Sequence, residues 1–223
     1  MLLLFDIDGT LLIRAADDHR AAIYAALRRV YHVHDPTEAK VETAGRTDPW
    51  IARSILLQLG VSARRIDDGM SDFKRVAVEE YRRRCRADLT GHVAPGVVET
   101  LEGLRDRDGV VLSLVTGNLE RIARMKLARA GIGEFFGGAH GGFGSDHEDR
   151  AELPGIARLR AGSNGQPYPR EETIVIGDTP LDIACARADG VRCVAVTTGQ
   201  YRADDLRDAD HVVHSARELA AVL

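Results

Sequence analysis

Short runs of apolar residues recur along the chain at widely separated positions. They occupy residues 2–7, 110–115, 173–176 and 191–196, with a shorter run at 211–213. Their hydrophobicity is continuous rather than alternating, which is typical of strands buried on both faces of a parallel sheet. Segments with helical periodicity lie between them, at residues 96–107, 119–130, 151–161 and 180–188. This alternation predicts an α/β fold with a doubly wound, mostly parallel sheet.

One long segment interrupts that alternation. Amphipathic helical patterns occupy residues 19–30, 48–59 and 71–86, with no convincing buried strand among them. We therefore expect an all-helical domain at residues 14–93, inserted into an α/β core formed by residues 1–13 and 94–223. Further along, the glycine-rich residues 131–144 are compatible with a short strand and an active-site loop, or with a flexible connection.

Composition and charge narrow the class of protein. Of 223 residues, 44% are hydrophobic and 29% are charged, which is the balance of a globular chain that can bury a full core. The net charge of −4 leaves no global positive field for nucleic acid. No run is long and apolar enough to span a membrane, and Asp6 ends the apolar start too early for a signal peptide. Three cysteines, at positions 85, 185 and 193, fit neither a disulfide framework nor a zinc site, so we expect a cytoplasmic protein. We also expect a monomer or a homodimer.

Carboxylates follow two of the predicted strands. Asp6 and Asp8 lie two residues apart at the end of the first strand, so they point to one side, and Gly9 lets the backbone turn. Open α/β sheets bind their ligands at this edge. Asp178 follows the strand at 173–176 in the same way. These carboxylates also have structural explanations. Asp8 could simply begin a turn, and Asp182, four residues after Asp178, could simply cap a helix.

A third strand end offers groups for an anion. The run at 110–115 leads into Thr116, Gly117 and Asn118, which combine a hydroxyl, a backbone amide and the start of a helix. Asn118 taken alone is an ordinary helix cap. Together, the three strand ends provide carboxylates for a hard divalent cation and donors for a phosphate.

These motifs, in this order, resemble the haloacid dehalogenase superfamily of hydrolases. The motifs are Asp6-x-Asp8-Gly9-Thr10, Thr116-Gly117-Asn118 and Gly177-Asp178-x-x-x-Asp182. The helical insertion is similar to the cap domain of phosphoglycolate phosphatases and β-phosphoglucomutases. The resemblance implies a Rossmann-like core. Because dehalogenases of this superfamily need no acid at the second aspartate, Asp8 favours phosphoryl transfer.

The resemblance also implies residue roles. Asp6 would be the nucleophile that forms an aspartyl-phosphate, and Asp8 the general acid and base. Mg²⁺ would be held by the Asp6 carboxylate, the Asp8 carbonyl and Asp178, with Asp182 in support. Thr116, Gly117 and Asn118 would bind the phosphoryl group, and the partner would be a small phosphorylated metabolite.

One position departs from the family pattern. The family usually has a lysine between its second and last motifs, but no lysine follows Lys126 in this chain. Arg150 is the best occupant of that position and would keep the positive charge. An ordinary surface arginine in an acidic stretch is the alternative.

Substrate choice is expected to lie in the cap. Gly45, Arg46, Thr47 and Asp48 form a glycine turn leading into a helix, and Arg46 is free to reach the distal group of a substrate. Helix capping and solvent exposure explain the same residues equally well. His19 is a weaker candidate than Arg46 for a contact with the substrate. The sequence favours a Mg²⁺-dependent phosphatase, with a phosphomutase or a low-turnover phosphate-binding regulatory module as alternatives.

Overall fold

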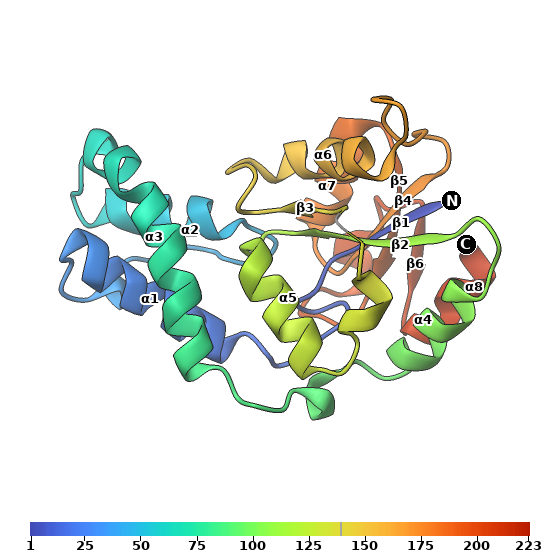
Figure 1. Ribbon diagram of the computed structural model, residues 1–223, viewed down its shortest axis with the longest axis horizontal. Coiled ribbons are helices and arrows are strands. Elements are labelled where there is room, and N and C mark those ends of the chain that lie inside the picture. Colours follow the sequence, from blue (N-terminus) through green and yellow to red (C-terminus); the bar gives the residue numbers. More distant parts are fainter. Residues whose placement is uncertain (139) are drawn as a thin grey trace.

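The computed structural model describes residues 1–138 and 140–223. The described residues form a six-stranded sheet with strand order β3-β2-β1-β4-β5-β6, in which every pairing is parallel (Figure 1). The strands are β1 (Leu2–Phe5), β2 (Val111–Thr116), β3 (Gly142–Phe143), β4 (Thr173–Gly177), β5 (Arg192–Val196) and β6 (His211–Val213).

Strand β1 lies inside the sheet and is buried on both faces. Phe5 pairs with Leu114 of β2 on one side and with Ile176 of β4 on the other. Leu2 and Leu4 pack into one hydrophobic cluster, and the alternate residues of β1 pack into another. Because side chains alternate across a sheet, the continuous apolar run supplies both faces at once.

Helices cover both faces of this sheet. Figure 1 shows α4, α5 and α8 on one face and α6 and α7 on the other. The core helices are α4 (Val97–Arg105), α5 (Glu120–Arg129), α6 (Leu153–Ala161), α7 (Pro180–Asp189) and α8 (Leu219–Val222). Short 3-10 helices occupy Pro36–Glu38, Thr90–His92, Gly133–Phe136, Arg150–Glu152, Ala203–Leu206 and Ala216–Glu218.

The segment between β1 and α4 is helical and contains no strand, and the structure describes all of its residues. It consists mainly of α1 (Asp17–Tyr31), α2 (Asp48–Gln58) and α3 (Ala63–Arg84), which stand beside the core in Figure 1. We call residues 17–84, from the start of α1 to the end of α3, the cap. The two chain crossings between cap and core lie together, because Ile13 N donates to His92 O at 2.8 Å and Ala94 N donates to Leu11 O at 3.0 Å. The exact domain bounds at 14 and 93 stay a prediction.

The predicted fold class is confirmed, with differences at the ends of elements. Helix α3 begins at Ala63 rather than at residue 71, because Ser62 caps it by accepting from Arg65 N at 3.4 Å. The glycine-rich stretch does hold a strand, but β3 has only two residues at the sheet edge. The carboxyl ends of β1, β2 and β4 meet on the side of the core that faces the cap.

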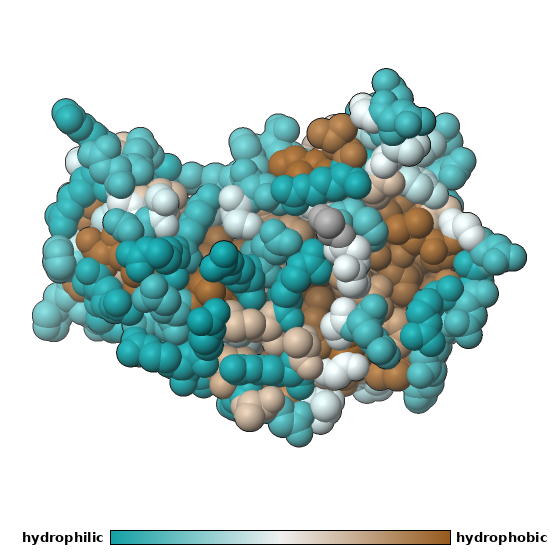
Figure 2. Space-filling view, in the orientation of Figure 1, coloured by the Kyte–Doolittle hydropathy of each residue, from teal (hydrophilic) through white to brown (hydrophobic). Residues whose placement is uncertain are grey.

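Hydrophobic side chains lie mostly inside. Figure 2 shows hydrophilic residues over most of the cap face that it draws, whereas hydrophobic ones reach the surface mainly over the core. Among the described residues, the large hydrophobic side chains that are clearly exposed are Leu57, Val98 and Leu159. No helix in the described part of the chain has the length and apolar character needed to cross a membrane.

Candidate active site

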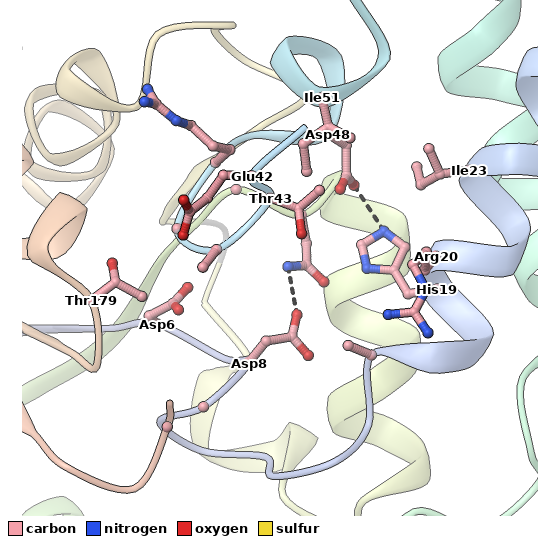
Figure 3. Close-up of a pocket in the computed structure, with 18 of the residues that line it drawn as sticks. Asp6, Asp8, His19, Arg20, Ile23, Glu42, Thr43, Asp48, Ile51 and Thr179 are labelled. Atoms are coloured by element: carbon pink, nitrogen blue, oxygen red, sulfur yellow. Dashed lines mark hydrogen bonds and ion pairs between the residues drawn. The ribbon is translucent and has the colours of Figure 1, made fainter. Parts of the chain in front are cut away.

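Asp6 and Asp8 lie directly beyond the end of β1 (Figure 3). The Asp6 amide donates to the carbonyl of Ile176 at 2.8 Å, so the backbone bonding between β1 and β4 extends to this residue. Gly9 then turns the chain with a φ of 89°. A side chain at Gly9 would also collide with the carboxylate of Asp178. Glycine is therefore needed here for the two strand ends to come together.

Three buried carboxylates gather at these strand ends. Oxygen atoms of Asp6, Asp178 and Asp182 all lie within 4.8 Å of one another. Burial raises the pKa of Asp6 to about 6, against the opposing charge of Arg150. Burial, together with the negative charges of Asp182 and Asp6, raises the pKa of Asp178 to about 8. Such a cluster is stabilised by a cation, and its oxygen donors suit a hard divalent ion.

Asp182 is the least available of the three carboxylates. Its Oδ2 accepts from the Thr179 amide at 3.0 Å and from the Thr179 hydroxyl at 2.7 Å, while its Oδ1 pairs with Arg150. The Asp182 amide donates back to Thr179 Oγ1 at 3.3 Å, which completes a capping box at the start of α7. Asp6 and Asp178 are thus the carboxylates of this cluster that could bind a metal most directly, because both oxygens of Asp182 are occupied by Thr179 and Arg150.

Arg150 is buried beside Asp6. Its Nη2 lies 3.3 Å from Asp6 Oδ1 and forms an ion pair with Asp182. Its Nη1 donates to the carbonyl of Gly45, in the cap, at 3.1 Å. Burial works to lower the pKa of Arg150, but the charges of Asp182 and Asp6 outweigh it and raise that pKa well above its usual value. The arginine expected from the sequence therefore places a permanent positive charge next to Asp6.

The predicted phosphate-binding residues lie against Asp8. Thr116 ends β2, and the Asn118 side chain donates to Thr116 Oγ1 at 3.1 Å and to Asp8 Oδ2 at 2.9 Å. Gly117 lies under the cap, since a side chain there would collide with the Arg46 carbonyl. Gly117 and Asn118 thus line the site next to the second aspartate, whereas Thr116 is fully buried and contacts Asn118.

The first backbone amides of helix α5 already donate hydrogen bonds to side chains of the protein. The Leu119 amide donates to Asp48 Oδ2 at 2.7 Å, and the Glu120 amide donates to Ser145 Oγ at 3.2 Å. Asp48 belongs to the cap. The sequence predicted an anion-binding corner at the start of this helix. In this arrangement two of its amides bind Asp48 and Ser145 instead of an anionic ligand.

Lys126 is a functional candidate that the sequence reasoning missed. Its side chain is fully buried, and its Nζ lies 2.6 Å from Asp8 Oδ2 and 3.1 Å from His19 Nδ1. Burial works to raise the pKa of Asp8, but Lys126 and His19 outweigh it, so that pKa is lowered. A cation therefore lies next to each of the two aspartates, Arg150 at Asp6 and Lys126 at Asp8.

A signal for Lys126 was present in the sequence. Lys126 lies on the buried face of α5 with Ile122, Ala123 and Leu127, where a lysine is out of place. It also lies between the second and last motifs, where the family usually has its lysine. What the pattern did not show is the partner, because Asp8 is 118 residues away in the chain.

A cavity of about 610 Å³ separates the cap from the aspartates. Figure 3 shows His19, Arg20 and Ile23 of α1 facing Asp6 and Asp8 across it. The remaining lining comes from both domains and includes Tyr24, Val41, Glu42, Thr43, Ile51, Gln200 and the glycine turn at Gly45. The cap therefore covers the aspartates and helps to line a space large enough for a small metabolite.

Arg46 also lines this cavity, but its guanidinium stacks on a neighbour. Its Cζ lies 4.1 Å from the centroid of the Trp50 ring. The distal contact expected of Arg46 would require it to leave this ring, so that role stays a prediction. The described arrangement gives His19 a clearer place at the site than the sequence suggested.

Comparisons with known proteins agree with this geometry. A family model described as haloacid dehalogenase-like hydrolase matches residues 3–187. Phosphoglycolate phosphatase 1 of Pseudomonas aeruginosa is 30% identical over 205 residues, which cover 89% of this chain and 70% of that protein. A phosphoglycolate phosphatase of Pseudomonas fluorescens is 29% identical over 202 residues, with the same coverage.

Solved structures share the fold at lower identity. A protein of Haemophilus somnus described as a predicted phosphoglycolate phosphatase has a TM-score of 0.67 at 22% identity, covering 99% of this chain and 96% of its own. A β-phosphoglucomutase of Clostridium difficile has a TM-score of 0.66 at 18% identity, covering 98% and 92%. With the site geometry and the family match, these findings show that the chain is a phosphatase of the haloacid dehalogenase-like hydrolase family.

Proposed function

We propose that this protein is a Mg²⁺-dependent phosphatase that hydrolyses a small phosphorylated metabolite through an aspartyl-phosphate at Asp6. The observation that carries the proposal is the pairing of Asp6 with Arg150 and of Asp8 with Lys126 at the floor of one cavity under the cap. A nucleophile, an acid and positive charge beside the phosphoryl group are the features that favour hydrolysis of a phosphate monoester.

In the first step, Asp6 attacks phosphorus while the bond to the leaving oxygen breaks. Asp8 in its protonated form gives that proton to the leaving oxygen, so that an alcohol leaves, and its lowered pKa makes it a stronger acid in this step. In the second step, Asp8 takes a proton from water, the resulting hydroxide attacks phosphorus, and the bond to Asp6 breaks to release phosphate. Arg150 stabilises charge next to Asp6 throughout, because guanidinium binds both carboxylate and phosphoryl oxygens.

The remaining predicted roles fit the same arrangement. Mg²⁺ would be held by the carboxylates of Asp6 and Asp178 and the carbonyl of Asp8, where it would neutralise phosphoryl oxygens. Thr116, Gly117 and Asn118 would contact the phosphoryl group. Asp182 would hold Arg150 in place, as its bonding supports.

The proposed substrate resembles phosphoglycolate or a sugar phosphate. The names of the relatives from Pseudomonas support the first, and the size of the cavity leaves room for the second. Arg46 would contact the distal group after leaving Trp50. The cytoplasmic location and the monomeric or homodimeric state stay predictions.

A panel of phosphorylated metabolites, assayed for inorganic phosphate with and without Mg²⁺, tests the proposal. We expect phosphate release from at least one compound in the panel, and loss of that release when Mg²⁺ is removed. Isomerisation of a sugar phosphate without phosphate release would instead show a phosphomutase. Turnover at background level across the panel would show a phosphate-binding module.

A further inference from the structure

A buried chain of polar side chains connects the cap to Asp8. Asp48 Oδ2 lies 3.0 Å from His19 Nε2, and His19 Nδ1 lies 3.1 Å from Lys126 Nζ. Lys126 Nζ then donates to Asp8 Oδ2 at 2.6 Å. Asp48, His19 and Lys126 are 3%, 7% and 0% exposed, so water competes little with these bonds. Figure 3 shows the contact between His19 and Asp48 at the cap side of the cavity.

The hydrogen bonds in this series of side chains can be donated in only one direction. The ammonium of Lys126 has donors and no acceptor, so His19 Nδ1 accepts from it. The proton of a neutral His19 then lies on Nε2, which donates to the carboxylate of Asp48. Each link therefore fixes the next, from the cap carboxylate to Asp8.

Asp48 also fastens the cap to the core. Its amide donates to the Gly117 carbonyl at 2.8 Å, and its Oδ2 accepts from the Leu119 amide at 2.7 Å. Asp48 and His19 belong to the cap, whereas Lys126 and Leu119 belong to the core. The complete chain therefore exists only while the cap is docked on the loop that follows β2.

The bonding of Asp8 shows which of its oxygens is left for a substrate. Oδ2 accepts from both Lys126 and Asn118. Oδ1 is buried and has no hydrogen-bond partner among residues 1–138 and 140–223. Two donors on one oxygen fix the orientation of the carboxyl group and leave the other oxygen for the leaving group.

We propose that Lys126 positions Asp8 for proton transfer, and that Asp48 and His19 of the docked cap in turn hold Lys126. The inference rests on the proposed function, because it assigns these residues to the acid and base of that reaction. Lys126 is the direct positioning residue. Asp48 and His19 act through it, so the acid is correctly placed only under a closed cap.

The test compares two substrates that differ in their need for an acid. An alkyl phosphate releases an alkoxide that must be protonated, whereas 2,4-dinitrophenyl phosphate releases an anion that leaves without a proton. Leaving-group release is measured in a single turnover, with enzyme in excess and Mg²⁺ present. The variants are Lys126→Met, His19→Ala and Asp48→Asn.

For Lys126→Met we expect release from the alkyl phosphate to slow by about 10- to 100-fold, which is the scale of one charge-assisted hydrogen bond. Release from the dinitrophenyl ester should change far less. His19→Ala and Asp48→Asn should show the same substrate dependence with smaller losses. In an Asp8→Asn background, Lys126→Met should cause no further loss, because its effect passes through Asp8.

Lys74→Met is the matched control. Lys74 belongs to the cap and its Nζ donates to the Ser145 carbonyl of the core at 3.0 Å, but it does not contact Asp8. This variant should treat both substrates as the parent protein does. Equal losses on both substrates for Lys126→Met, or no loss on either, would overturn the inference. Absence of turnover in the parent protein would instead contradict the proposed function.

Discussion

Arg150 joins two carboxylates that serve the site in different ways. It lies 3.3 Å from Asp6, the proposed nucleophile, and it pairs with Asp182, which caps α7. Because all three side chains are buried, removing the arginine would leave two carboxylates without their cation. Its position ties the chemistry of Asp6 to the stability of the neighbouring helix.

Arg150→Met is therefore expected to lower both activity and stability. Loss of charge next to the phosphoryl group should reduce kcat by about 10²- to 10³-fold. The unpaired carboxylates should cost about 3–5 kcal/mol of unfolding free energy, measured by urea titration. Arg150→Lys should recover part of the activity, since the charge returns without the fork that reaches Asp6, Asp182 and Gly45.

Arg158→Met is the control for this prediction. Arg158 is buried as deeply and pairs with Asp189 at 2.6 Å and 2.9 Å, away from the cavity. The Arg158→Met variant should have a lower free energy of unfolding, but its folded form should keep the parent kcat. Wild-type kcat in Arg150→Met, measured under folded conditions, would show that Arg150 has a structural role alone.

At the scale of elements, the cap rests on the loop between β2 and α5. The Asp48 amide bonds to the Gly117 carbonyl, and Arg53 of α2 pairs with Glu148 of the core at 2.7 Å. Thr47 Oγ1 donates to the carbonyl of Glu148 at 2.5 Å. The start of α2 is thus the part of the cap that touches the predicted phosphate-binding residues.

Gly117→Ala is expected to loosen this contact. The added Cβ would collide with the Arg46 carbonyl, which is backbone and cannot rotate away. Such overpacking costs about 1–3 kcal/mol, so amide hydrogen exchange should speed up at Asp48 and Leu119. Gly103→Ala is the control, because a Cβ there meets nothing within 4 Å and Gly103 lies inside α4. Unchanged exchange in Gly117→Ala would contradict the proposed tight docking.

Local patterns explain which elements could be predicted. The strands at 2–7, 110–115 and 173–176 could be predicted because a strand buried on both faces of a sheet needs a continuous apolar run, which is visible in the sequence. Strand β3 has only two residues, so the glycine-rich stretch at 131–144 was compatible with a short strand but did not distinguish it from a flexible connection. Arg150 was found through the family order of motifs. Lys126 was missed because its partner Asp8 is distant in sequence, and only the three-dimensional fold brings their charges together.

At the scale of the whole molecule, cap and core enclose a site that contains a cluster of buried carboxylates. Asp6 and Asp178 have raised pKa values of about 6 and about 8, mainly from burial. An unfolded aspartate titrates near pKa ~3.9. The folded, metal-free protein therefore binds protons that the unfolded chain releases, and its stability falls as pH rises from about 4 to about 8.

Added Mg²⁺ should take the place of these protons. We expect it to raise Tm more at pH 8 than at pH 5, because at pH 8 folding no longer gains from protonated carboxylates. Thermal unfolding at both pH values, with and without Mg²⁺, measures this difference. Asp178→Asn should abolish most of the Mg²⁺ effect. An equal increase in Tm at both pH values would show that the ion does not bind at this cluster.

The central claim is that Asp6 carries the phosphoryl group during turnover. The most direct measurement is mass spectrometry of the protein quenched in acid during a single turnover with Mg²⁺ and a substrate found in the panel. We predict a phosphoryl group on the peptide that contains Asp6, appearing before phosphate is released, and no turnover in Asp6→Asn. Phosphate release without any modified Asp6, together with an active Asp6→Asn variant, would contradict the account.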